Sequence, residues 1–313
     1  GRDFSYFSWS VDFNNSNRSN SEGEDVNFQN STALIRYAVG REFSLFARAG
    51  QSSNSFASNS NSNNNGVFYT FGGQWQPSHR FRLEAGYGNN RFVTVEITPF
   101  NRLHWITTYS NNDIGLNTGD TWNTRLNYNT RRTVWSLSYN EQTLTTQQLL
   151  LELQTRTATL VFINPDTNQI QFQDIQFNTL LPTLVDDVFI SKRAGLSVSF
   201  KTGKSNISAD IFRIQRTFEL SGVEEEVKGV SGSWNWSFVR RSNFSLRSSW
   251  QKSESDGINA FSDKRFNISA RITRNILSRL NGSVEYRYVD QRSENDLNSY
   301  SENRITANLS LRF

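Results

Sequence analysis

The chain's last ten residues decide the fold, and they read Arg304-Ile305-Thr306-Ala307-Asn308-Leu309-Ser310-Leu311-Arg312-Phe313. Apolar residues occupy the odd positions up to the final Phe313, and polar residues occupy the even ones. A period of two is the geometry of a β-strand, whose successive side chains point to opposite faces. The pattern therefore predicts a strand with one face against apolar surroundings and the other against water.

The overall composition extends this reading to the whole chain. Only 35% of the 313 residues are hydrophobic and the mean hydropathy is −0.61, values that resemble those of disordered chains. Aromatic residues nevertheless reach 13%, there are only 4 prolines, and the apolar residues are regularly spaced. A transmembrane β-barrel accounts for this combination, because only alternate residues of each strand face lipid. We therefore expect an all-β chain that forms one antiparallel transmembrane β-barrel over residues 1–313.

Several other classes of protein are disfavoured by the same composition. No run approaches the roughly 20 apolar residues of a transmembrane helix. Cysteine is absent, which leaves no disulfide framework, thiolate metal site or cysteine nucleophile. The net charge of +4 is small, and no basic cluster interleaved with aromatics suggests nucleic acid. Because the chain starts at Gly1 and has no methionine, we expect that a signal peptide has been removed.

Strand patterns recur along the chain and predict about sixteen strands, within a range of 14–18. Asn/Ser-rich segments at 14–30 and 52–65 are expected to be long outer loops, whereas tight turns near 41–42 and 77–80 are expected on the periplasmic side. An even number of strands would put both ends of the wall on the periplasmic side. The predicted strands lie near residues 7–13, 35–39, 43–49, 67–75, 81–87, 91–98, 102–110, 120–129, 133–143, 194–201, 205–215, 228–238, 242–251, 264–274, 279–289 and 303–313.

The segment 145–191 interrupts this rhythm on the predicted outer side. It holds two strand-like runs, 157–163 and 169–173, around the turn sequence Asn164-Pro165-Asp166-Thr167-Asn168. Three arrangements are open: a hairpin that projects beyond the membrane, a lid folded into the lumen, or an additional strand pair in the wall. We favour an extended extracellular hairpin or a lid.

Four segments resemble one protein family: 130–139, 181–193, 283–288 and, most closely, 302–313. The family is that of outer-membrane β-barrel proteins associated with the PEP-CTERM/exosortase and exopolysaccharide system. The resemblance covers roughly residues 120–313. It implies a place in the bacterial outer membrane among lipid and lipopolysaccharide, and a role in export of polysaccharide or surface protein. By resemblance to outer-membrane proteins in general, Phe313 is the insertion signal that the barrel-insertion machinery recognises. No catalytic residue follows from it.

The polar face of the strands supplies the candidate lumen-lining residues. An arginine-rich wall would favour anions, because fixed positive charge lowers the entry cost of a negative solute. The simpler interpretation is a structural charge ladder, such as Glu285 between Arg271 and Arg304, and it is the favoured one. The candidates are Arg36, Arg48, Arg82, Arg125, Arg247, Arg271, Glu285, Arg287, Arg304 and Arg312.

Other residues give weaker signals. Asn and Ser side chains with aromatics are compatible with sugar binding, although any water-filled barrel has them. The tryptophans at 75, 135, 234, 236 and 250 are expected to face lipid or form an interfacial girdle. Two acidic segments, at 186–187 and 224–226, could bind Ca²⁺ through their carboxylate oxygens. We expect instead that both are solvated loops.

A catalytic site and a cofactor are not expected. Only two histidines are present: His79 falls in a predicted turn, and His104 has the polar parity of its strand. Nucleophilic catalysis needs a serine, a histidine and an orienting group within hydrogen-bond reach, and no spacing here suggests such a set. A two-histidine metal site is disfavoured because the two side chains belong to different ends or faces of the predicted barrel.

The sequence thus predicts a non-enzymatic outer-membrane channel or export-associated conduit, for exopolysaccharide or anionic solutes. The alternative is a structural anchor or docking barrel that binds another surface protein or fibre through its outer loops. A third hypothesis, an outer-membrane hydrolase, would require a serine beside His104.

Overall fold

The computed structural model describes residues 6–18, 26–55, 65–115, 118–145, 157–163, 170–176, 188–256, 260–277, 280–294 and 298–311. Within these ranges the chain is built from strands. Among them no helix is long and apolar enough to cross a membrane. The strands are β1 (Phe7–Arg18), β2 (Val26–Ala38), β3 (Phe43–Ser55), β4 (Gly66–Ser78), β5 (Phe81–Gly88), β6 (Asn90–Phe100), β7 (Leu103–Asn112), β8 (Gly119–Asn129), β9 (Thr133–Thr145), β10 (Thr157–Ile163), β11 (Ile170–Gln176), β12 (Val188–Lys201), β13 (Ser205–Phe218), β14 (Glu224–Val239), β15 (Ser242–Ser255), β16 (Phe261–Leu277), β17 (Leu280–Ser293) and β18 (Tyr300–Leu311).

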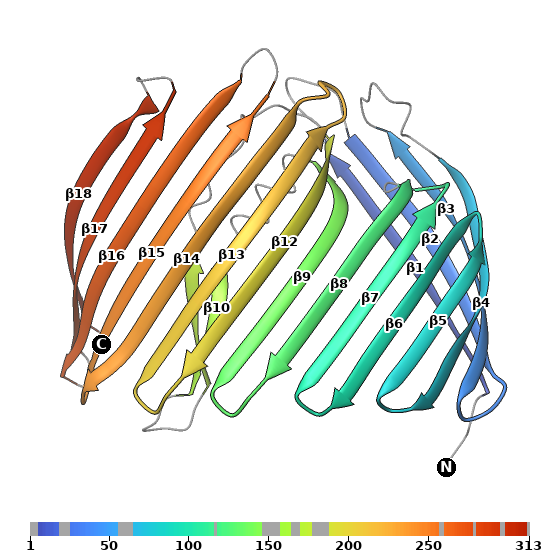
Figure 1. Cartoon of the computed structure of the whole chain (residues 1–313), viewed down its shortest axis with the longest axis horizontal. Helices are drawn as coiled ribbons and strands as arrows, with labels where there is room; N and C mark the ends of the chain where they lie inside the picture. Colours follow the sequence, from blue (N-terminus) through green and yellow to red (C-terminus); the bar gives the residue numbers. More distant parts are fainter. Residues whose placement is uncertain are drawn as a thin grey trace.

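Sixteen of these strands form one sheet in which each strand pairs with the next strand of the wall. The order runs from β1 to β9, continues directly to β12, and ends at β18, and all pairings are antiparallel. The sheet curves, so that β1–β3 turn behind β5–β7 in Figure 1. The prediction of an antiparallel barrel wall of about sixteen strands is confirmed.

The two faces of the sheet differ as the alternation predicted. On one face, large apolar side chains are exposed: Trp9 is 71% exposed, Tyr87 is 76% and Ile305 is 75%. Four of the five predicted lipid-facing tryptophans are among these exposed residues, and Trp234 stacks on Trp236 with ring centroids 5.5 Å apart. A sheet that exposes so much apolar surface on one face and polar side chains on the other has the pattern of a transmembrane β-barrel wall.

The connections between strands are short at one end of the sheet and mostly longer at the other. Residues 79–80, 101–102 and 240–241 make two-residue turns at the lower end of Figure 1, where both marked chain ends also lie. We call this the turn end, and the opposite end the outer end. Not every connection at the outer end is long, because Asn89 alone separates β5 from β6.

The predicted loop boundaries at 14–30 and 52–65 are wrong. Residues 14–18 belong to β1, residues 26–30 to β2 and residues 52–55 to β3, with Asn14 opposite Asn30 and Asn27 opposite Ser55. The physical reason is that backbone ladders form without apolar side chains. The strands therefore continue past the point where their outer face stops being apolar.

The insertion contains a strand pair of its own. β10 and β11 form a separate two-stranded sheet, which Figure 1 draws behind β12–β14. β9 pairs directly with β12 up to Thr145 and Val188, so the hairpin is not part of the wall. The predicted turn at 164–168 lies outside the described residues, and the choice between a projecting hairpin and a lid stays a prediction.

A charge on the apolar face should cost far more stability than the same charge one residue away. Leu196 faces outward and is 40% exposed, whereas Ser197 lies opposite Asp210 on the polar face. We expect Leu196→Arg to lower the free energy of unfolding in lipid vesicles by about 2–4 kcal/mol if it lies near the midplane. Urea titration measures this. Ser197→Arg is the matched control, and equal losses in both variants would contradict the assignment of faces.

Candidate functional site

The cross-strand registers place nine predicted lumen-lining residues on one face of the sheet, opposite the exposed aromatics. Arg82 lies opposite Glu96, and Glu96 lies opposite Ile106, which faces Arg125. Further along the wall, Ser269 lies between Arg247 and Arg287, and Arg287 faces Arg304. The other four are Arg36, Arg48, Arg271 and Glu285. Arg312 and Phe313 are outside the described side chains.

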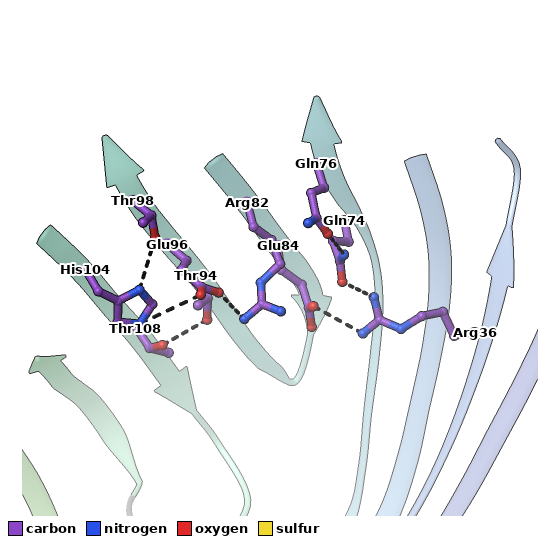
Figure 2. A network of polar contacts seen from close by, with 10 residues as sticks. All are labelled: Arg36, Gln74, Gln76, Arg82, Glu84, Thr94, Glu96, Thr98, His104 and Thr108. Carbon is purple, nitrogen blue, oxygen red and sulfur yellow. Dashed lines mark hydrogen bonds and ion pairs between the residues drawn. The ribbon is translucent and has the colours of Figure 1, made fainter. Parts of the chain in front are cut away.

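Two groups of polar contacts lie side by side on this polar face, one on β2, β4 and β5 and the other on β5, β6 and β7 (Figure 2). Arg36 Nη2 lies 3.1 Å from Glu84 Oε2, and Arg36 also donates to Gln74. Arg82 pairs with Glu96, which lies 3.8 Å from His104 Nε2. Each of the two arginines thus has one glutamate as its ion-pair partner.

Two phenylalanine rings lie flat against the wall beneath two of the predicted arginines. Gly72 and Gly86 lack side chains where the Phe46 and Phe92 rings pass, and a Cβ added at Gly72 would overlap the backbone oxygen of Ala85 as well as the Phe46 ring. The two rings stack with centroids 5.8 Å apart. The guanidinium carbon of Arg36 lies 5.3 Å from the centre of the Phe46 ring. The guanidinium carbon of Arg48 lies 5.0 Å from the centre of the Phe92 ring. The guanidinium groups are therefore held close to the wall by cation–π contacts.

Beside this stack the polar face holds a recess of about 320 Å³. Its walls combine hydroxyl and amide groups with aromatic rings, and it carries one arginine and one glutamate. This volume is at the lower limit of pockets that bind small molecules. The lining residues are Arg48, Phe68, Thr70, Glu84, Asn90, Phe92, Thr94, Thr108, Ser110 and Asn112.

The predicted charge ladder near the end of the chain is present in a changed form. Arg271 forms an ion pair with Glu285, as expected. Arg304, however, lies 3.5 Å from Glu302 rather than at Glu285, because the register puts Thr306 opposite Glu285. Arg287 donates to Asn267 Oδ1 at 3.2 Å.

Four predicted arginines, at 48, 125, 247 and 287, form no ion pair with a described carboxylate. Arg48 stacks on Phe92 without an ion pair, and Arg125 is exposed and unpaired within the same ranges. Arg247 has a buried Nε that donates to no partner in the described part of the chain, although Glu285 lies within electrostatic range of this guanidinium. These groups are not held in ion pairs by the described side chains.

Sequence reasoning missed a buried ion pair at the outer end of β13 and β14. Arg216 Nη1 lies 2.8 Å from Glu225 Oε2, and their side chains are only 1% and 3% exposed. Ser253 donates to the same carboxylate, and Phe189 packs near the guanidinium. Glu225 belongs to the run 224–226 that was expected to be a solvated loop; that prediction is wrong, because the run begins β14. The signal that could have found this pair is the alternation along the strands, because Arg216 and Glu225 both occupy positions on the polar face.

Neither of the histidines forms a recognisable catalytic set in the described structure. His104 Nδ1 lies 3.2 Å from Thr98 Oγ1, and Nε2 is near Glu96. A histidine beside a carboxylate supplies two parts of a hydrolytic triad, but the described contacts of His104 include no serine. Within the described residues there is no group of His, Asp or Glu side chains that could hold a metal ion, and the pair at 186–187 lies outside them.

No family model matches this chain, and no curated protein matches it in sequence. Among solved structures it is similar to an OmpT variant lacking loop L8, an outer-membrane protein of Vibrio cholerae, with 7% identity over 96% of this chain and 99% of the other, at a TM-score of 0.41. It is also similar to an anion-selective porin from Comamonas acidovorans, with 7% identity, 97% and 98% coverage and a TM-score of 0.37. A bacterial polysaccharide outer-membrane secretin matches with 8% identity, 98% and 97% coverage and a TM-score of 0.36.

These likenesses concern general architecture, and no residue or activity is carried over from them. The wall itself indicates a membrane, because its exposed apolar face requires lipid and its backbone groups pair between adjacent strands of one sheet. The chain is a β-barrel protein of the bacterial outer membrane.

The small residues beneath the flat rings should be intolerant of a side chain. A methyl group at Gly72 would meet backbone atoms of β5, whereas one at Gly73, on the apolar face, would only approach the Phe43 ring at 3.2 Å. We expect Gly72→Ala to lower the free energy of unfolding by about 1–3 kcal/mol. Gly73→Ala is the control. Denaturant titration in lipid compares the two, and equal stability would contradict the close packing of Phe46.

The buried and exposed ion pairs should differ in their contribution to stability. Arg216→Met leaves Glu225 buried without its partner and is expected to cost about 3–5 kcal/mol. Arg213→Met breaks the exposed pair with Glu226, which lies 2.8 Å away, and should cost less than about 1 kcal/mol. Heat-dependent gel mobility and urea unfolding report both values. Similar losses in the two variants would show that Glu225 reaches water.

Proposed function

We propose that the protein is a non-enzymatic outer-membrane channel whose polar face favours anionic solutes. The observation that supports this most directly is the group of four arginines, at 48, 125, 247 and 287, that form no ion pair in the described structure. A sixteen-stranded wall is wide enough to leave an aqueous path. Fixed positive charge along such a path lowers the entry barrier for anions.

The proposal includes acidic exopolysaccharide as a solute of this conduit. Hydroxyl, amide and aromatic side chains beside Arg48 line a recess on the polar face, and such groups bind sugars through hydrogen bonds and ring contacts. The resemblance of residues 120–313 to the exosortase-associated family agrees with this solute class. Barrel-insertion machinery, and a polysaccharide or a surface protein, are the partners that this role requires.

The second candidate is an anchor or docking barrel. The paired charges of Arg36 with Glu84, and of Arg82 with Glu96, are what a closed polar interior would contain. Under this alternative the wall would hold the outer-end segments in place for a surface protein or fibre, and no solute would cross.

Single-channel recording in a planar bilayer tests the proposal. We expect steady conductance with anion preference under a salt gradient. The triple variant Arg48→Gln, Arg125→Gln, Arg247→Gln should reduce the anion-to-cation permeability ratio several-fold, because it removes three of the four positive charges that form no ion pair.

The control removes the same number of charges from the short turns, through Arg131→Gln, Arg132→Gln and Lys204→Gln, all of which are exposed. An equal fall in selectivity in the control would contradict the role of the polar face. Absence of conductance, from protein shown to be folded by heat-modifiable gel mobility, would overturn the channel and favour the anchor.

A further inference from the structure

A continuous row of basic residues crosses five strands on the apolar, outward face of the wall. The registers place Arg213 opposite Lys228, Lys228 opposite Lys252, Lys252 opposite Lys264, and Lys264 opposite Arg292. Directly opposite residues in an antiparallel sheet are close neighbours, and like charges in such positions destabilise the pairing. We call these five residues the basic row.

The basic row marks the upper limit of the lipid-facing band on β13–β16. Two residues closer to the turn end, the next row on the same face is apolar on these strands, where Ile211 is 57% exposed, Val230 43% and Trp250 38%, and it ends at Asp290 on β17. The row thus lies at the height where the outer leaflet passes from acyl chains to headgroups. At the outer ends of β2 and β3, by contrast, the outward positions are uncharged Gln29, Ser31, Gln51 and Ser53.

The carboxylates beside the basic row neutralise only part of its charge. Glu226 lies 2.8 Å from Arg213 and 3.8 Å from Lys228, and Glu254 contacts Lys252 and lies 3.5 Å from Lys228. The third carboxylate, that of Asp290, is 3.0 Å from Arg292.

Five cations against three carboxylates leave two positive charges (5 − 3 = 2). Lys264 is exposed and makes no ion pair with the described residues. The uncancelled charge is therefore concentrated toward the Lys252 and Lys264 side of the row.

We propose that the basic row binds the phosphate groups of lipopolysaccharide in the outer leaflet. One surface offers both halves of such a ligand: exposed apolar side chains for the acyl chains and, directly above them, cations for the phosphates. A soluble anion or an acidic glycan would need the cations alone, and would gain nothing from the apolar row beneath them. The inference rests on the outer-membrane placement and not on conduction, so a barrel that conducts nothing would still bind this lipid.

The test measures binding of bisphosphorylated lipid A to the full-length barrel in detergent micelles, with monophosphorylated lipid A as a second probe. Lys252→Gln with Lys264→Gln should weaken binding of the bisphosphorylated lipid roughly 30-fold, from the usual contribution of a lysine near an anionic lipid surface. Lys201→Gln with Lys204→Gln removes two lysines at the turn end and should leave affinity unchanged. Both double variants should keep wild-type conductance and heat-modifiable mobility.

Wild-type protein alone also decides the question, should the Lys252 and Lys264 variant not fold. It should bind the bisphosphorylated lipid more tightly than the monophosphorylated one, with a difference that shrinks as salt rises. Equal affinity for both lipids, or equal losses in the two double variants, would overturn the proposal. Complete displacement of the lipid by an equal concentration of inorganic phosphate would show a free-anion site instead, and would overturn it too.

Discussion

The structure depends on one constraint, which is that backbone amide and carbonyl groups within lipid must find partners inside the protein. A sheet in which each strand pairs with the next strand of the wall meets this demand along the sixteen-stranded order from β1 to β18. Because the ladder needs no particular side chain, it continues beyond the apolar band, as the Asn/Ser-rich ends of β1, β2 and β3 show. Side-chain chemistry then changes along a strand without interrupting it.

The same ladder separates two kinds of chemistry onto two faces. Since successive side chains point to opposite sides, a shift of register by one residue would exchange the lipid-facing and polar sets. The outward face carries the exposed aromatics and ends in the basic row at the outer end. Polar and apolar side chains of the same strands therefore face opposite sides of the wall.

On the polar face, packing divides the arginines into two groups. Glycines at 72 and 86 let phenylalanine rings lie flat, and these rings support the guanidinium groups of Arg36 and Arg48. Arg36 also reaches a glutamate, whereas Arg48 finds no carboxylate among the described residues. Arginines with and without an ion-pair partner therefore lie on one wall.

The sequence by itself determined the fold class, the number of wall strands and the face on which each of the nine described candidates lies, because all three follow from a period of two. It could not determine which charges pair. Arg36 and Glu84 are 48 positions apart and meet only through the registers of three intervening strand pairs. The buried Arg216–Glu225 pair and the basic row could not be predicted either, because they also depend on the registers between strands. Alternation specifies a face, whereas register between strands specifies a neighbour, and register exists only in the assembled sheet.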